Sequence, residues 1–253
     1  MKTMKFLSVF LFSMIIFASA QEAPPPTLVQ QGDMAYKNLD NKKALDFYLK
    51  AFQNDTTNYE AAWKCSRAFV DVGEKLEGDE RAENYKKGKE FAEKAIALNP
   101  EGSNGHLFYS VATGRVALDA GAKERIRLSK EIKQHVDLAI KYDPKNDIAY
   151  HVLGRWNRKL SNLSWVEKKF ANLFLGGVPK EASYDNAVFN FKKAIELHPE
   201  HINHHLELGI TYKEMDEKGL AKKEFETCLS LANSDADDPE YKAQAKKYLD
   251  DLK

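Results

Sequence analysis

An internal repeat constrains the fold of this chain more than any other feature of its sequence. Five segments share one spacing, in which a small or apolar residue is followed four positions later by an apolar or aromatic residue and three positions after that by a small residue. A spacing of four and then three places all three residues on one face of a helix. The triplets are Ala44/Tyr48/Ala51, Gly88/Ala92/Ala95, Ile132/Val136/Ala139, Ala187/Phe191/Ala194 and Ala221/Phe225/Cys228. The chain is therefore predicted to consist of repeated helical units.

Each triplet is followed, five residues after its last member, by a position suited to end a helix. These positions are Thr56, Pro100, Pro144, Pro199 and Asn233, separated by 44, 44, 55 and 34 residues. The last separation equals the tetratricopeptide period, and proline cannot continue a helix. In several units a small residue also precedes an aromatic one in an earlier segment, as Gly154 precedes Trp156, and it would let two helices approach closely. The sequence resembles a tetratricopeptide array with insertions in its second, third and fourth units.

We therefore expect an all-α fold, a tetratricopeptide-like right-handed superhelical solenoid of about five helix pairs with helical insertions and a C-terminal capping helix. The expected solenoid covers residues 27–253, with repeats at about 27–58, 59–102, 103–146, 147–201 and 202–235 and a capping helix at 238–252. Capping boxes are predicted at Thr27/Gln30, Thr57/Glu60 and Ser164/Glu167.

The N-terminal residues have a composition of their own. Two lysines precede an uncharged run from Phe6 to Gln21, which contains the small-residue pattern Ala18–Ala20. The run has 16 residues, fewer than the roughly 20 that span a membrane, and it matches a cleaved export signal. We expect residues 1–20 to be a signal peptide, residues 21–26 to be a proline-rich spacer, and the protein to be periplasmic or secreted. Retention of the run as an N-terminal membrane anchor is the alternative.

Charge and motif content exclude several classes of function. The chain has 38 basic and 38 acidic residues, and removal of the predicted signal leaves 36 and 38. This balance is unlike that of a strongly basic nucleic-acid binder, so no nucleic-acid partner is expected. The sequence has none of the common nucleophile, phosphate-loop, zinc-protease or dinucleotide motifs, so neither an enzyme nor a cofactor is predicted. Cys65 and Cys228 fall three repeats apart, beyond the reach of about 7 Å that a disulfide allows, and are expected to be buried free thiols.

A group of histidines at the junction of the fourth and fifth repeats is the one candidate metal site. Its members are His198, His201, His204 and His205. They cross from a helix end through a turn into the next helix, and we expect His201 and His204 to diverge once that helix starts. A solvated turn between repeats is the favoured interpretation, and no metal is predicted.

The central third of the chain carries a more specific resemblance. The relevant segments are His106, Tyr109-Ser110-Val111, Lys123-Glu124-Arg125-Ile126, Lys130–Ile140, His151–Trp156 and Leu163–Lys169. They resemble the regulator of microtubule dynamics family of tetratricopeptide-like proteins. The resemblance implies a helical scaffold associated with membranes or the cytoskeleton, without catalysis.

The concave face of the solenoid is the candidate binding groove. Counting from the repeat register places eight candidate ligand-binding residues along it: Tyr36, Trp63, Arg67, Arg115, Arg155, Arg158, Lys159 and Lys213. Arginine forks suit carboxylates and phosphates, and aromatic rings hold apolar side chains. An extended acidic peptide, a C-terminal carboxylate or a phosphorylated head group is the predicted ligand. The alternative is a basic helix face that is solvated or paired with acids from the insertions.

The longest insertion is predicted to contain a helix of its own with a substantial apolar face. Trp165, Phe170 and Phe174 lie on it, next to Lys168 and Lys169. The face is expected to fold back onto the solenoid, or alternatively to contact a partner or lie in a membrane interface. The function predicted from the sequence is a non-catalytic protein-protein interaction scaffold, and the alternative is a membrane- or microtubule-associated adaptor.

Overall fold

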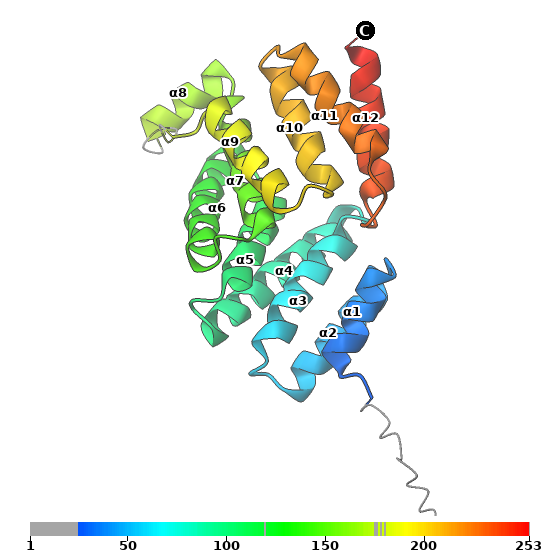
Figure 1. Cartoon of the computed structure of the whole chain (residues 1–253). Helices are drawn as coiled ribbons and strands as arrows, with labels where there is room; N and C mark the ends of the chain where they lie inside the picture. Colours follow the sequence, from blue (N-terminus) through cyan, green and yellow to red (C-terminus); the bar gives the residue numbers. More distant parts are fainter. Residues whose placement is uncertain (1–24, 119, 175–176, 178, 180, 253) are drawn as a thin grey trace, which may run out of the picture.

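A computed structural model describes residues 25–118, 120–174, 177, 179 and 181–252 as a chain of helices. The helices form successive pairs that stack into a curved solenoid (Figure 1). The pairs are α1 (Leu28–Lys37) with α2 (Asn41–Asn54), α3 (Tyr59–Gly73) with α4 (Gly78–Leu98), α5 (Ser103–Val116) with α6 (Ala122–Tyr142), α7 (Asp147–Ser161) with α9 (Tyr184–Leu197), and α10 (Ile202–Glu214) with α11 (Lys218–Ser230). The expected all-α solenoid is confirmed. The predicted signal peptide and most of the predicted spacer lie outside the described residues.

The repeated triplets form the interior of each helix pair. Tyr48, Phe191 and Phe225 are fully buried in the second helices of their pairs. Each ring lies against a glycine of the preceding helix in the pair. A Cβ atom added to Gly154 would lie 2.8 Å from the ring of Phe191, and one added to Gly209 would lie 2.6 Å from the ring of Phe225. The small residues are therefore required because the helices approach too closely for any side chain.

Side-chain caps fix where several of the helices begin. Thr27 and Gln30 form the predicted capping box, with Oγ1 of Thr27 accepting from the backbone of Gln30 at 3.2 Å. The box predicted at Thr57 is wrong, because Asn58 caps α3 and accepts from the backbone of Ala61 at 2.9 Å. The Thr57 hydroxyl instead donates to Asp55 in the preceding turn, at 2.6 Å.

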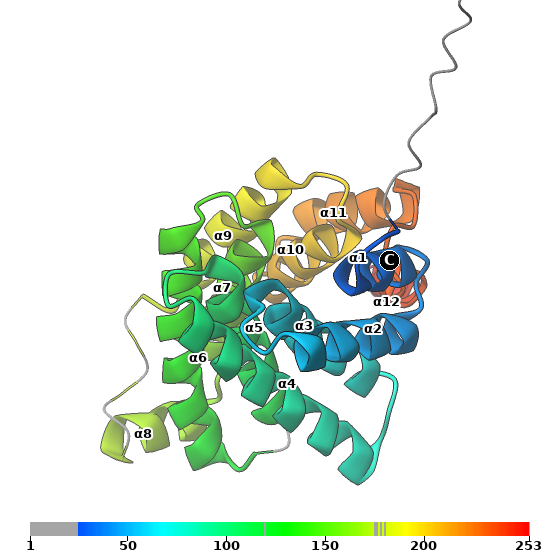
Figure 2. The same ribbon diagram turned by 90° about the horizontal axis from the view of Figure 1, so that it is seen from below.

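The insertions take two forms. Those in the second and third repeats lengthen the second helix, so that α4 and α6 each have 21 residues. The one in the fourth repeat contains α8 (Trp165–Phe174), which begins at the predicted Ser164/Glu167 capping box. α8 projects from the solenoid and meets the other helices through α6 (Figures 1 and 2). None of the described helices is long and apolar enough to cross a membrane.

The chain ends in α12 (Asp238–Asp251), which packs against α10 and α11. Its apolar side contributes Ala245, Tyr248 and Leu249 to the core cluster of the last repeat. The curvature of the solenoid brings the start of α12 back to the end of α3. There Nζ of Lys75 lies 2.5 Å from Oδ1 of Asp237, so the two halves of the superhelix touch.

Candidate functional site

A cavity of about 270 Å³ lies on the concave side, where residues from both halves of the solenoid meet. It is partly open to solvent and is lined mainly by polar and charged side chains. The lining comprises Glu74, Lys75, Arg81, Tyr85, Arg115, Arg155, Asn203, Leu206, Glu207, Asp237, Glu240, Tyr241 and Gln244. Helices as distant in sequence as α4, α7 and α12 therefore contribute to one site.

Two of the predicted groove residues, Arg115 and Arg155, line this cavity. Arg115 forms an ion pair with Glu74, at the end of α3. Arg155 approaches Glu207 of α10 through Nε, at 3.4 Å. Burial raises the pKa of Glu74, and the Arg115 guanidinium opposes that rise. Burial also acts to raise the pKa of Glu207, but Arg155 and Arg158 outweigh it and hold the pKa below its usual range.

Arg158 occupies a different environment from the exposed groove face that was predicted. Its side chain is only 5% exposed, and it forms ion pairs with Glu207 and, at 2.7 Å, with Glu214. Both acids belong to α10 of the next repeat and not to an insertion. Arg158 therefore joins two repeats and is not available to a ligand.

The other predicted groove residues are not among the described residues that line the cavity. Lys159 is exposed, and Nζ of Lys213 lies 5.2 Å from the ring of Tyr248 on α12. In the N-terminal repeats the guanidinium of Arg67 stacks on Tyr36, 3.7 Å from the ring centroid. The indole of Trp63 stacks on Phe108, with ring centroids 5.5 Å apart.

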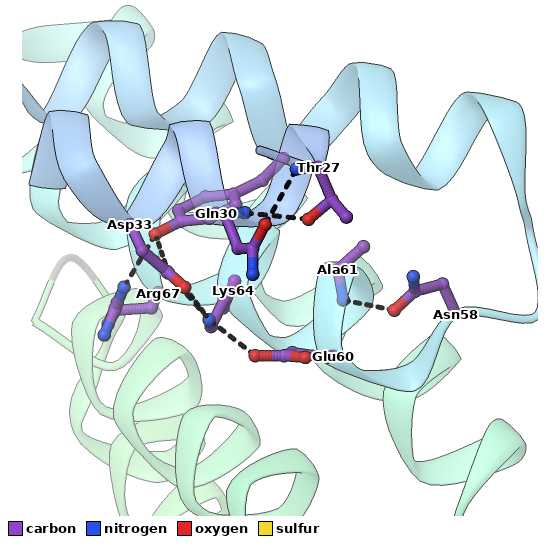
Figure 3. A network of polar contacts seen from close by, with 9 residues as sticks. Thr27, Gln30, Asp33, Asn58, Glu60, Ala61, Lys64 and Arg67 are labelled. Atoms are coloured by element: carbon purple, nitrogen blue, oxygen red, sulfur yellow. Dashed lines mark hydrogen bonds and ion pairs between the residues drawn. The ribbon is translucent and has the colours of Figure 1, made fainter. Parts of the chain in front are cut away.

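A buried lysine next to Arg67, missed by the sequence analysis, joins the first two repeats. Nζ of Lys64 lies 2.6 Å from Oδ1 of Asp33 on α1 and 2.6 Å from Oε1 of Glu60 (Figure 3). Its side chain is 8% exposed. Asp33 also accepts a hydrogen bond from the Tyr48 hydroxyl at 2.8 Å. The contact is structural, because both charges of the lysine-aspartate pair are used within the fold.

The acids that neutralise the cavity were also missed. Neither Glu74 nor Glu207 was among the residues predicted for the groove. The available sequence signal was the acidic stretch around Asp235, Asp237 and Glu240, which follows the last repeat without a basic residue. The predicted basic excess is therefore paired internally, largely with acids from other repeats.

The histidine group is compact and forms a hydrogen-bonded network. Nδ1 of His204 lies 3.0 Å from Nδ1 of His151, and its Nε2 lies 3.0 Å from Oδ2 of Asp147. The expected divergence of His201 and His204 is wrong, because their rings stack with centroids 4.1 Å apart. Burial and the adjacent His204 lower the pKa of His201 to about 3. The His201 ring is therefore neutral at physiological pH.

The geometry of this group is that of a repeat junction. The described residues contain no group of three or more His, Cys, Asp or Glu side chains placed to hold a metal ion. Nε2 of His205 lies 2.9 Å from the carbonyl of Pro199, and His106 makes the same contact with Pro100 two repeats earlier. The recurring contact ties a helix to the turn before it. Cys65 and Cys228 are buried free thiols.

The structure leaves the start of α8 exposed. Trp165 is 72% exposed and Val166 is 67% exposed, so these two residues do not fold back onto the solenoid. Nζ of Lys169 lies 4.8 Å from the ring of Trp165. The side chains of Phe170 and Phe174, the other two predicted contact residues, lie outside the described part of the structure.

The helix pairs, their small-residue contacts and the concave cavity define a tetratricopeptide-type solenoid protein. A solved tetratricopeptide protein of Thermus thermophilus superposes with a TM-score of 0.66 at 17% identity, covering 87% of this chain and 97% of that one. The type IV pilus biogenesis factor PilW superposes with a TM-score of 0.54 at 16% identity, covering 89% and 90%. The chain belongs to the family described as regulator of microtubule dynamics protein 1-3, whose sequence profile matches residues 28–253.

Curated relatives support this assignment. Regulator of microtubule dynamics protein 3 of Rattus norvegicus is 31% identical over 212 residues, which cover 81% of this chain and 44% of the rat protein. Regulator of microtubule dynamics protein 2 of Homo sapiens is 32% identical over 196 residues, covering 77% and 48%. The chain thus spans about half the length of these relatives. The fold and the family support an adaptor role in protein interactions.

Proposed function

We propose that this protein is a non-catalytic scaffold that binds an extended acidic segment of a partner in the concave cavity. The observation that carries the proposal is the convergence of Arg115 and Arg155, from successive repeats, on one partly open cavity. Their side chains are 24% and 33% exposed. Arg155 approaches Glu207 through Nε, at 3.4 Å, and the terminal nitrogens of a guanidinium fork suit a carboxylate.

The size of the cavity favours part of a polymer over a free small molecule. Its volume of about 270 Å³ falls below the roughly 300–1,000 Å³ of typical small-molecule sites. One acidic side chain or a C-terminal carboxylate fits this space, while the rest of the segment continues along the concave face. Tyr241, which is partly exposed, lines the same cavity and offers ring surface to flanking apolar groups.

The proposal predicts that the double substitution Arg115→Gln and Arg155→Gln weakens binding of acidic peptides at least tenfold. Both substitutions remove the forks but keep a polar side chain next to Glu74 and Glu207. Fluorescence anisotropy with acidic, neutral and basic peptide libraries measures the effect. Inorganic phosphate, as a competitor at equal ionic strength, distinguishes a phosphorylated ligand from a carboxylate one.

The matched control is Arg125→Gln with Arg127→Gln, which removes the same charge from exposed positions on α6. It is expected to leave peptide affinity unchanged. Equal affinity of the cavity variant and this control, with both folded by circular dichroism, would contradict binding through Arg115 and Arg155.

A membrane- or microtubule-associated adaptor is the second candidate function, and the exposure of Trp165 and Val166 favours its membrane form. Tryptophan prefers the membrane interface, and Lys168 and Lys169 on the same helix suit anionic head groups.

We expect residues 21–253 to float with vesicles that contain anionic phospholipid, and Trp165→Ala with Val166→Ser to reduce the floated fraction several-fold. Met34→Ala with Leu220→Ala, which removes exposed apolar groups from other helices, serves as the control. Equal flotation of the two variants would leave α8 without a membrane role.

A further inference from the structure

The superhelix is closed by a short acidic segment, residues 234–241, here called the latch. It comprises the turn after α11 and the first turn of α12, and it reaches the end of α3. Nζ of Lys75 lies 2.5 Å from Oδ1 of Asp237 and 3.8 Å from Oε2 of Glu240. The carboxyl group of Asp237 also lies near that of Glu74 and acts to raise the pKa of Glu74. These contacts close one side of the central cavity.

The latch is held by charges and not by apolar packing. Among the described residues, no apolar cluster combines members from α1–α4 with members from α10–α12. The side chain of Lys75 is 48% exposed, and a salt bridge at such a site contributes only about 0–1 kcal/mol. The closed form of the superhelix is therefore weakly held compared with the repeats themselves.

Like charges face each other across the same contact. Asp71 of α3 lies near Asp235 and Asp237 of the latch, with Arg67 as the opposing cation. Burial raises the pKa of Asp71 to about 8, and the neighbouring acids add to this rise. One buried carboxylate oxygen of Asp71 has no hydrogen-bond partner among the described residues. The fit between the latch and α3 is thus incomplete.

The latch carries acidic side chains of the kind proposed for the partner segment. Its own conformation is fixed by Asp238, whose Oδ2 accepts from the backbone of Ser234 at 2.6 Å and of Asp235 at 2.7 Å. This arrangement leaves Asp235 and Asp237, two residues apart, to face Arg67 and Lys75. An acidic segment of this chain therefore already occupies a basic part of the concave face.

We infer that the latch is an internal stand-in for the partner, and that a partner segment with two acids two residues apart displaces it from Lys75. The inference rests on the proposed function. It specifies the spacing of the partner's two acids, and it assigns to the latch the regulation of access to the cavity. An occupant within the same chain reduces the apparent affinity for an external ligand to the intrinsic affinity multiplied by the fraction of open molecules. Neutralising the latch removes the competitor and leaves the basic surface intact.

The test uses the full chain and a fluorescent peptide of residues 232–242 supplied as a separate molecule. The variant Asp235→Asn with Asp237→Asn keeps the shape of the latch and removes its charge. We expect this variant to bind the peptide about tenfold more tightly than the wild type. The gain should disappear when Lys75→Gln is added, and a peptide with asparagine at both positions should bind neither chain.

The charge-matched control is Glu217→Gln with Glu226→Gln, two exposed acids at the start and along the outer side of α11. Equal peptide affinity of the latch variant and this control would overturn the inference. Should the double variant fail to melt cooperatively, Asp237→Asn alone is expected to give a gain of about threefold, and no gain would again overturn it.

Failure of the latch and failure of the proposed function give different results. In one case, acidic library peptides bind the wild type and the latch variant equally and still require Arg115 and Arg155. That result would contradict the inhibitory role of the latch and would support binding in the groove. If no acidic peptide binds either chain, both the inhibitory role of the latch and the proposed function are contradicted.

Discussion

Replacement of Arg158 by methionine is expected to lower the free energy of unfolding by about 3–5 kcal/mol. Arg158 is buried between two repeats, where it pairs with Glu207 and Glu214. Without it, Glu207 remains charged in a site that is 8% exposed, with only the longer contact to Arg155. Urea unfolding followed by circular dichroism at neutral pH measures the loss.

The size of this effect depends on the charge left behind rather than on the pair itself. The double variant Arg158→Met with Glu207→Leu is therefore expected to recover most of the lost stability. Arg127→Met is the matched control, because Arg127 pairs with Glu124 at an exposed site and its loss should cost less than about 1 kcal/mol. Similar losses for Arg158→Met and Arg127→Met would contradict the structural role assigned to Arg158.

The substitution Gly154→Ala is expected to destabilise the protein by about 2–3 kcal/mol, although alanine has a higher helix propensity than glycine. The added methyl group would lie 2.8 Å from the ring of Phe191, which is fully buried and cannot move without disturbing the pair of α7 and α9. Chemical denaturation measures the change. Adding Phe191→Leu should recover part of the loss, since a smaller side chain gives the methyl group space.

Gly114→Ala is the control for this prediction. Gly114 lies inside α5, and a Cβ atom there would be no closer than 3.9 Å to its neighbours. Alanine should stabilise the protein at this site by about 0.5–1 kcal/mol, because it favours the helix and meets no obstacle. The two glycines then give changes of opposite sign. A stabilising effect of Gly154→Ala would show that α7 and α9 are farther apart than described.

Local spacing in the sequence predicts the repeats well because each repeat depends mainly on its own helices. The triplet containing Phe225 and the glycine opposite it, Gly209, lie in adjacent helices of one pair, so periodicity alone places them together. The cap of α3 was missed because two neighbouring residues compete for it, and Asp55 holds the Thr57 hydroxyl in the turn. Such competition between local hydrogen bonds is not visible in a spacing pattern.

The candidate site is harder to predict because it depends on the curvature of the whole solenoid. Repeat register was sufficient to place Arg115 and Arg155 on the concave side. The contacts between Arg158 and Glu207, and between Lys75 and Asp237, join residues 49 and 162 positions apart. Small angles between successive repeats, summed along the chain, decide whether such residues meet. No single segment of the sequence contains that information.

The two cysteines lie in different parts of the solenoid, and this separation gives a way to observe its two ends independently. Cys65 belongs to the apolar cluster of the first two repeats, and Cys228 belongs to the cluster of the last. Burial raises the pKa of each thiol to about 12, so neither reacts with a thiol reagent while its cluster is closed. Each modification rate therefore reports the frequency of local unfolding at one end of the unaltered protein. Unequal rates would mean that the ends open as separate units, and equal rates would mean that the solenoid unfolds as one.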